Sequence, residues 1–291
     1  MANQKEIKRR IRSVQKTQQI TSAMRMVSAA KLRRAQDAIL ALRPYSQQIW
    51  ATMYELGRRQ PELTHPLLRV RPDPKRLEVL VIASDRGLCG AFNANVLKAG
   101  QAALVERAPK FEQITVSTIG RKAAEFVRRR RPLEKSWLVG QGMDFGLARE
   151  VGQYLAERYA SGAVDEVVLV GNEFVSALTQ RPVVVRLLPL VPEFSRVRSY
   201  AEDQGREPFE IEPDVNALLE VLVPQALEFT IYRALLESWA GEHAARMAAM
   251  ESATRNTEEL IRSLTLQFNR ARQAAITKEL MEIVSGAEAL K

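Results

Sequence analysis

The sequence is poor in residues that form disulfides or bind metals. Among its 291 residues are one cysteine, Cys89, and two histidines, His65 and His243. A lone cysteine excludes an internal disulfide and fits a reducing compartment, and three such residues far apart in the sequence do not make a metal set. Long apolar runs are also missing. Runs such as Val79–Ala83 and Val167–Val170 are strand-sized, whereas a membrane-spanning helix needs ~20 apolar residues.

Phosphate-binding motifs are absent as well. The chain contains neither G-x-G-x-x-G nor G-x-x-x-x-G-K-[ST], the glycine-rich loops that cradle nucleotide phosphates. The loop Ser84–Gly90 (SDRGLCG) leaves a strand-like run and enters a helical one. It is a phosphate loop, a glycine-assisted turn or a protein-contact loop, and the missing motif favours the last two. Cys89 has no neighbouring histidine to act as a base. We expect no catalytic activity and no cofactor.

Positive charge is in excess. Lys and Arg number 43 against 34 Asp and Glu, a net charge of +9, which indicates an acidic partner such as nucleic acid, an anionic membrane or an acidic protein surface. A basic cluster near the N-terminus is either a phosphate-contact stripe or the solvated face of a helix. Its members are Lys8, Arg9, Arg10, Arg12 and Lys16. The first residues lack the apolar core of a signal peptide, and a cytosolic protein is expected.

Two long helical runs lie at the ends of the chain, roughly Glu6–Leu56 and Val215–Ala289. In the first, apolar residues recur in steps of three and four, as one helical face requires. They are Ile7, Ile11, Val14, Ile20, Met24, Val27, Ala38, Leu42, Tyr45, Ile49, Met53 and Leu56. Pro44 predicts a kink, or a restart of the helix after Arg43.

The C-terminal run has a 3.5-residue period, which is typical of pairing with another helix. The positions are His243, Met247, Met250, Thr254, Thr257, Ile261, Leu264, Phe268, Ala271 and Ala275. A helix rises ~1.5 Å per residue, so runs of ~50 residues reach ~75 Å. Rods of this length favour a mechanical or scaffolding role over a pocket enzyme.

Between the two runs, β-rich and helical stretches alternate. Strands are predicted over 77–83, 114–119, 137–139, 167–170 and 183–188, and helices over 93–107, 122–130 and 145–159. Such alternation predicts a mostly parallel sheet with right-handed crossovers.

Three strings are similar to the gamma subunit of the F-type, or rotary, ATP synthase. They are residues 11–27 (IRSVQKTQQITSAMRMV), 84–90 (SDRGLCG), and 269–280 (NRARQAAITKEL) with 282–287 (EIVSGA). The resemblance runs in matching order from residue 2 to 290. It implies a long antiparallel two-helix coiled coil formed by both termini plus a central Rossmann-like α/β domain. The implied segments are an N-terminal shaft helix at 1–58, the α/β domain at 75–192, a linker at 193–208 and a C-terminal shaft helix at 209–291.

The same resemblance implies a central rotor shaft. Such a shaft transmits torque from a membrane ion-driven ring to a catalytic nucleotide-binding ring, and couples proton transport to ATP synthesis and hydrolysis. The implied partners are the alpha and beta subunits of the catalytic ring, the epsilon subunit and the membrane c-ring, with no nucleic acid and with the membrane reached only through partners. The chain would be a non-catalytic, peripheral subunit at the cytoplasmic face of a bacterial cell membrane.

Contact residues are implied where the strings match. Coupling to the catalytic ring is implied for Met24, Arg25, Arg86, Cys89, Arg246, Arg272, Gln273 and Thr277, and membrane-ring contact for Glu212. Photosynthetic relatives carry an inserted cysteine pair that this chain lacks, so thiol regulation of that kind is not expected.

Two other classes of protein stay open. A basic coiled-coil adaptor for nucleic acid or anionic membrane also accounts for the +9 charge, and it predicts salt-sensitive binding to random DNA. A nucleotide-dependent α/β enzyme predicts a rise in melting temperature with its ligand.

Overall fold

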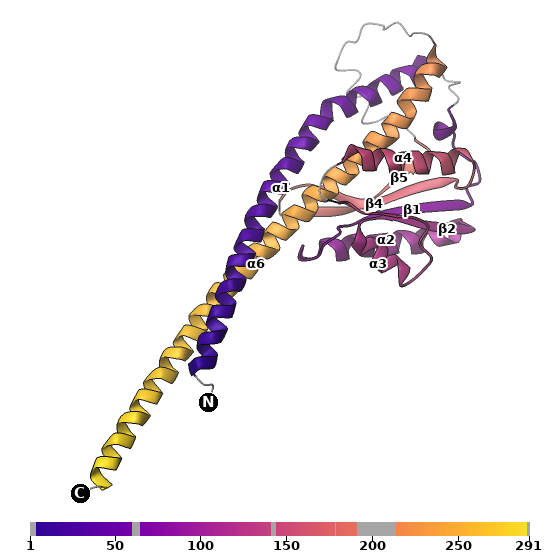
Figure 1. The fold of residues 1–291 in the computed structure, drawn as a ribbon. Coiled ribbons are helices and arrows are strands. Elements are labelled where there is room, and N and C mark those ends of the chain that lie inside the picture. The colour runs from indigo at the N-terminus through magenta and orange to yellow at the C-terminus, as the bar shows by residue number, and fades with distance from the viewer. Residues whose placement is uncertain (1–3, 60–64, 141–143, 178, 191–213, 290–291) are drawn as a thin grey trace. The chain divides into compact units, whose positions relative to one another are not determined.

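The computed structural model describes residues 4–59, 65–140, 144–177, 179–190 and 214–289 (Figure 1). Its helices and strands follow in chain order. They are α1 (Gln4–Arg59), the 3-10 turn η1 (Pro66–Leu68), β1 (Arg76–Ile82), α2 (Phe92–Arg107), the 3-10 turn η2 (Ala108–Lys110), β2 (Gln113–Ile119), α3 (Arg121–Arg128), β3 (Ser136–Trp137), α4 (Phe145–Ala160), β4 (Glu166–Phe174), β5 (Gln180–Leu188) and α6 (Val215–Ala289). The two predicted terminal runs are confirmed as α1, of 56 residues, and α6, of 75 residues.

The chain divides into two compact units. One comprises Met1–Ala29 and Arg246–Lys291, and the other comprises Ala30–Ala245. Both long helices contribute residues to each unit. The segment boundaries expected from the sequence stay a prediction, and the linker 193–208 lies outside the described residues.

A five-stranded sheet organises the second unit, in the order β3-β2-β1-β4-β5. β1 pairs in parallel with β2 and β4, β2 pairs in parallel with β3, and β5 runs antiparallel to β4. The mostly parallel sheet is therefore confirmed. The antiparallel last strand follows from chain length, because the link from Phe174 to Gln180 is too short for the crossover of ~12 residues that a parallel strand needs.

Helices cover both faces of this sheet (Figure 1). Alternate β1 residues point to opposite faces: Val79 and Val81 pack with α2 and α3 residues, whereas Leu80 and Ile82 pack with α4, α1 and α6 residues. Burial on both faces explains why β1 reads as a continuous apolar run.

Helix α1 continues through Pro44, so of the two alternatives expected there, the restart of the helix after Arg43 does not occur. Proline removes one intrahelical hydrogen bond. Residues on either side of it are nevertheless anchored, because Leu42 is buried and Ile49 belongs to the core of the second unit. Tertiary packing thus keeps the helix intact where local propensity opposes it.

A carboxylate clasp holds the amino ends of β1 and β4. The Asp165 side chain, 5% exposed, accepts hydrogen bonds from the guanidinium groups of Arg71 and Arg76 and from the backbone N–H groups of Lys75 and Arg76. Burial alone would raise the pKa of Asp165, but the hydrogen bonds from Arg76, Arg71 and the backbone outweigh burial and hold that pKa well below its ordinary value.

A second buried carboxylate lies within the sheet. Glu78 of β1 is fully buried and accepts hydrogen bonds from Ser117 Oγ at 2.5 Å and Arg158 Nε at 2.7 Å. Arg158 also donates to Glu134 Oε1 at 2.8 Å. Burial raises the pKa of Glu78, although the bonds from Ser117 and Arg158 act in the opposite direction.

Candidate functional surfaces

The first unit is an antiparallel pair of helices. Its cross-helix contacts join Gln4 to Ala271 (3.3 Å), Gln18 to Glu258 (3.3 Å), Thr21 to Thr254 (2.8 Å) and Arg25 to Glu251 (3.6 Å). As the residue number rises along α1, that of the partner on α6 falls. This regular order fixes both the antiparallel direction and the register of the pair.

The seam predicted for α6 is confirmed residue by residue. Between 251 and 275, every predicted position is buried or half-buried, and most of the residues between them are exposed. Leu264, at 8% exposure, lies deepest. A 3.5-residue repeat keeps one stripe of a helix facing its partner.

The apolar stripe expected along α1 is partly wrong. Ile20 and Val27 are 60% and 56% exposed, whereas the polar residues Thr21 and Ser28 are 8% and 2% exposed. The seam keeps its spacing of three and four through these hydroxyls, each of which also hydrogen-bonds a carbonyl of its own helix. Apolar periodicity alone therefore misplaced the contact face by one residue.

Helix α6 continues past the start of the described part of α1. Gln4 lies opposite Ala271, so residues 272–289 project beyond that point within the first unit (Figure 1). Arg272, Gln273 and Thr277 all lie on this projecting segment and are exposed. The segment also exposes large apolar side chains, among them Leu280 (57%) and Ile283 (68%).

The other α1 and α6 candidates lie in less exposed positions. Met24 is half-buried, and Arg25 is half-buried beside Glu251 at 3.6 Å. Arg246 is buried, at 7% exposure. Direct contact with a partner is therefore open to Arg25 but restricted for Arg246.

The loop Ser84–Gly90 follows β1 and enters α2. The Asn93 side chain holds the loop in place. Its Nδ2 donates to Ser84 Oγ (2.8 Å) and Cys89 Sγ (3.2 Å), and its Oδ1 accepts from the backbone N–H of Ser84 (3.0 Å). Cys89 is thereby held at 2% exposure, whereas Arg86 is exposed and Leu88, with φ of 61°, is 64% exposed. Arg86 and Leu88 form the accessible part of the loop, and the sequence alone did not single out Leu88.

The loop lies where open α/β sheets commonly bind ligands. The strand order reverses at β1, between β2 and β4, and ligand sites form outside the carboxyl ends of strands at such switch points. Here the Asp85 carboxylate accepts from the backbone N–H of Arg121, at the start of α3 (2.9 Å), and from that of Gly140 (3.1 Å). A side chain of the protein itself thus satisfies donors that a phosphate would otherwise use.

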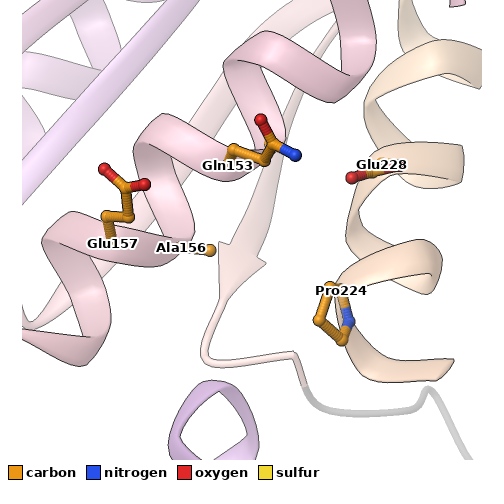
Figure 2. Close-up of a pocket in the computed structure, with 6 residues that line it drawn as sticks. Gln153, Ala156, Glu157, Pro224 and Glu228 are labelled. Atoms are coloured by element: carbon orange, nitrogen blue, oxygen red, sulfur yellow. The ribbon is translucent and has the colours of Figure 1, made fainter. Parts of the chain in front are cut away.

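A small cavity of about 210 Å³ lies between α4 and α6 (Figure 2). Gln153 and Glu157 line it from α4, and Pro224 and Glu228 line it from α6. Glu228 is buried, which raises its pKa although Arg149 lies 3.8 Å away. The cavity brings acidic groups together without a convergent set of donors, and it suits packing at Pro224 more than substrate binding.

Metal and membrane features were sought over the described ranges. There, His, Cys, Asp and Glu side chains form no group of three that could hold a metal ion. None of the described helices is both long enough and apolar enough to cross a bilayer. Glu212, implied as a membrane-ring contact, lies outside the described residues.

Paired terminal helices together with a mostly parallel α/β sheet define the class of protein to which this chain belongs. Residues 3–290 match a family described as ATP synthase. The chain is 50% identical over 299 aligned positions to the ATP synthase gamma chain of Anaeromyxobacter sp. (strain Fw109-5), covering 100% of both chains. It is 45% identical over 292 positions to that of Geobacter metallireducens, again with full coverage of both.

Solved structures show the same fold. A chain of the Euglena gracilis mitochondrial ATP synthase (OSCP/F1/c-ring, rotational state 3) superposes with a TM-score of 0.65 at 21% identity, covering 99% of this chain and 94% of that one. A chain of the Tetrahymena thermophila mitochondrial ATP synthase central stalk and c-ring gives 0.61 at 24% identity, covering 80% and 99%. With both terminal helices and the sheet accounted for, the chain belongs to the ATP synthase gamma chain family.

Proposed function

We propose that this chain is the central rotor shaft of a rotary ATP synthase. It transmits torque from a membrane ion-driven ring to the catalytic ring of alpha and beta subunits, and so couples proton transport to ATP synthesis and hydrolysis. It is a non-catalytic subunit, and its remaining partners are the epsilon subunit and the c-ring. The complex is peripheral at the cytoplasmic face of a bacterial cell membrane. The 45–50% identity with gamma chains over the full length of both chains supports this proposal.

The observation that carries the proposal is the antiparallel pair with its projecting end. A two-helix rod resists twisting better than one helix. The contacts from Gln4 with Ala271 to Arg25 with Glu251 fix the register of the two helices. The projecting α6 segment offers an exposed guanidinium and amide at Arg272 and Gln273. Charge-assisted hydrogen bonds from such groups contribute ~1.5–3 kcal/mol each, and they form and break during turning without a large apolar interface.

The contact assignments divide by exposure. Arg272, Gln273 and Thr277 contact the catalytic subunits directly, and Met24, Arg25 and Arg86 do so from partly or fully exposed positions. Cys89 and Arg246 are buried, so we assign them a positioning role: Cys89 for its loop and Arg246 for α6. Glu212 stays a proposed membrane-ring contact.

The basic residues of α1 have an acidic protein surface as their partner under this proposal. Lys8, Arg9 and Arg12 are exposed, and long-range attraction brings them to the ring without a fixed register. Salt-sensitive binding of the free chain to random DNA would instead favour the adaptor class.

Arg272→Ala tests the shaft contact. Arg272 is exposed, so folding is unaffected, whereas loss of a charged hydrogen bond of ~1.5–3 kcal/mol lowers coupled ATP synthesis roughly 10- to 150-fold. Arg129→Ala, at an exposed arginine after α3, is the matched control. The chain is co-expressed with alpha, beta and epsilon subunits to measure assembly and ATP hydrolysis with and without it. Coupled ATP synthesis is measured in the complete complex that includes the membrane ring. Near-normal synthesis and assembly in Arg272→Ala would reject this contact.

A further inference from the structure

Gly241 lies in the interior of α6, and it is buried. Glycine is less favourable than alanine inside a helix, so a glycine at this position indicates that a side chain would not fit. A Cβ at Gly241 would lie 3.1 Å from Phe92 Cε2 and 3.3 Å from Gln180 Cγ. Because carbon atoms pack best at ~3.5–4.0 Å, both contacts are too close. The missing side chain thus lets the starts of α2 and β5 pack directly against the backbone of α6.

The two neighbouring side chains have little freedom to move aside. Phe92 is 4% exposed, and its backbone N–H donates to the carbonyl of Cys89 at 3.1 Å. The Gln180 side chain is tied at its end, because its Nε2 donates to the carbonyls of Ser176 (3.3 Å) and Ala177 (3.2 Å). A side chain added to α6 would therefore displace the start of α2 by a few tenths of an ångström.

Helix α6 faces α1 on its other side. Successive helical residues are turned by ~100°, so Trp239 and His243, each two residues from Gly241, point away from Phe92. Their rings pack edge to face with centroids 4.9 Å apart. The Nζ of Lys31, on α1, lies 6.0 Å from the centre of the Trp239 ring. A shift of α6 away from Phe92 would therefore push Trp239 toward α1.

Phe92 is joined by hydrogen bonds to the accessible part of the loop Ser84–Gly90. Its N–H holds the carbonyl of Cys89, and the next residue, Asn93, donates to Ser84 Oγ at 2.8 Å. Ser84 Oγ in turn donates to the carbonyl of Arg86 at 2.5 Å. A displacement of the first turn of α2 therefore moves the backbone of Arg86, whose side chain is exposed.

We infer that the packing of Gly241 against Phe92 positions Arg86 for its contact with the catalytic ring. Gly241 and Phe92 are positioning residues, because both are buried and act through the loop. The inference rests on the proposed function, in which Arg86 contacts the catalytic subunits. Gly241 precedes Ala245, the last residue of the second unit, by about one helical turn. The loop is therefore fixed to α6 just before this helix enters the helix pair of the first unit.

Gly241→Ala in the complete complex, including the membrane ring, tests the inference. A misplacement of 1 Å can cost ~100-fold in rate, so a shift of a few tenths of an ångström should lower coupled ATP synthesis roughly threefold to tenfold. Phe92→Leu, added to Gly241→Ala, removes the aromatic Cε2 atom and should restore most of that loss. Gly100→Ala, on α2, is the control. A Cβ there would lie 3.6 Å from its nearest neighbour, Val81 Cγ2, and synthesis should stay at the wild-type level.

A second substitution separates positioning from folding. In an Arg86→Ala complex the contact with the catalytic ring is already lost, so Gly241→Ala should cause no further fall in ATP synthesis, although its effect on the melting temperature of the free chain persists. Purely structural damage would lower synthesis by the same factor in both backgrounds, and this result would overturn the inference. Wild-type synthesis by Gly241→Ala alone would overturn it as well.

The remaining outcomes distinguish this inference from the proposed function. If Arg86→Ala synthesises ATP at the wild-type rate, the inference is wrong, and the Arg272→Ala test of the shaft proposal is unaffected. If the wild-type chain does not support synthesis in the complex, both fail. Should Gly241→Ala not assemble, Phe92→Ala removes the contact from the other side without adding an atom. It should lower synthesis by a similar factor, and synthesis at the wild-type rate in Phe92→Ala would overturn the inference.

Discussion

Replacing Asp165 with asparagine probes how the amino ends of β1 and β4 are held together. The carboxylate lies at 5% exposure between Arg71 and Arg76, whose side chains are 25% and 42% exposed. Asparagine keeps the shape of the side chain and one acceptor oxygen, but it removes the charge and the second acceptor. Both arginines then lose their ion pair, and Arg71 keeps its hydrogen bond to the carbonyl of Tyr159.

The size of the effect follows from burial. Removing one partner of a buried ion pair costs ~3–5 kcal/mol. Because water screens the partly exposed Arg76, the expected loss of stability lies below that range, at ~2–3 kcal/mol. For a chain of this size, 1 kcal/mol shifts the melting temperature by roughly 2–4 °C, which predicts a fall of roughly 4–12 °C.

Urea unfolding monitored by tryptophan fluorescence measures the change, with Asp73→Asn, at an exposed aspartate, as the control. The pKa of Asp165 is lowered in the folded chain. Its contribution is therefore complete above its ordinary pKa of ~3.9 and is lost as the pH falls below that value. The difference between the wild type and Asp165→Asn should be constant from pH 5 to 8 and shrink in more acidic buffer. If Asp165→Asn is as stable as the Asp73→Asn control, the ion pairs of Asp165 do not hold the amino ends of β1 and β4 together.

Two further changes test the packing of the sheet. A Cβ at Gly120, where φ is +98°, would lie 2.0 Å from the carbonyl oxygen of Ala83. Gly120→Ala should therefore lower the free energy of unfolding by more than the ~1–3 kcal/mol that backbone strain alone costs. Gly140→Ala, where φ is +72° and nothing lies within 4 Å, should lower it by no more than that. Equal urea midpoints for the two variants would contradict this prediction. Burial raises the pKa of Glu78, so the wild type should lose stability relative to Glu78→Gln as the pH rises above ~4.5. If the difference in unfolding free energy between the two proteins does not change with pH, the pKa of Glu78 is not raised by folding.

The sequence predicted the parts of the fold that depend on local spacing. The α6 seam, the strand positions and the α/β order all follow from periodicity of the apolar residues. The α1 seam was missed at Thr21 and Ser28, because a hydroxyl that bonds its own helix can occupy a contact position that a search for apolar residues overlooks. The antiparallel β5 was within reach of the sequence through the short link after Phe174.

The contacts that fix the candidate surfaces were beyond such reasoning. Asp165 meets Arg71, and Asp85 meets the amide of Gly140, across long stretches of chain, and no local pattern marks either pair. The burial of Cys89 and Arg246 likewise depends on tertiary packing. The contact residues themselves came from resemblance to a family, and their roles await the substitutions described above.

The most direct test of the shaft is to watch it turn. The assembly is fixed to a surface through its catalytic ring, and a bead is attached to a cysteine introduced by Arg129→Cys, an exposed position; Cys89, at 2% exposure, does not compete for the label. With ATP present, the bead is expected to rotate in one direction at a rate set by hydrolysis. Undirected motion of the bead while hydrolysis continues at its full rate would show that this chain is not the rotor shaft.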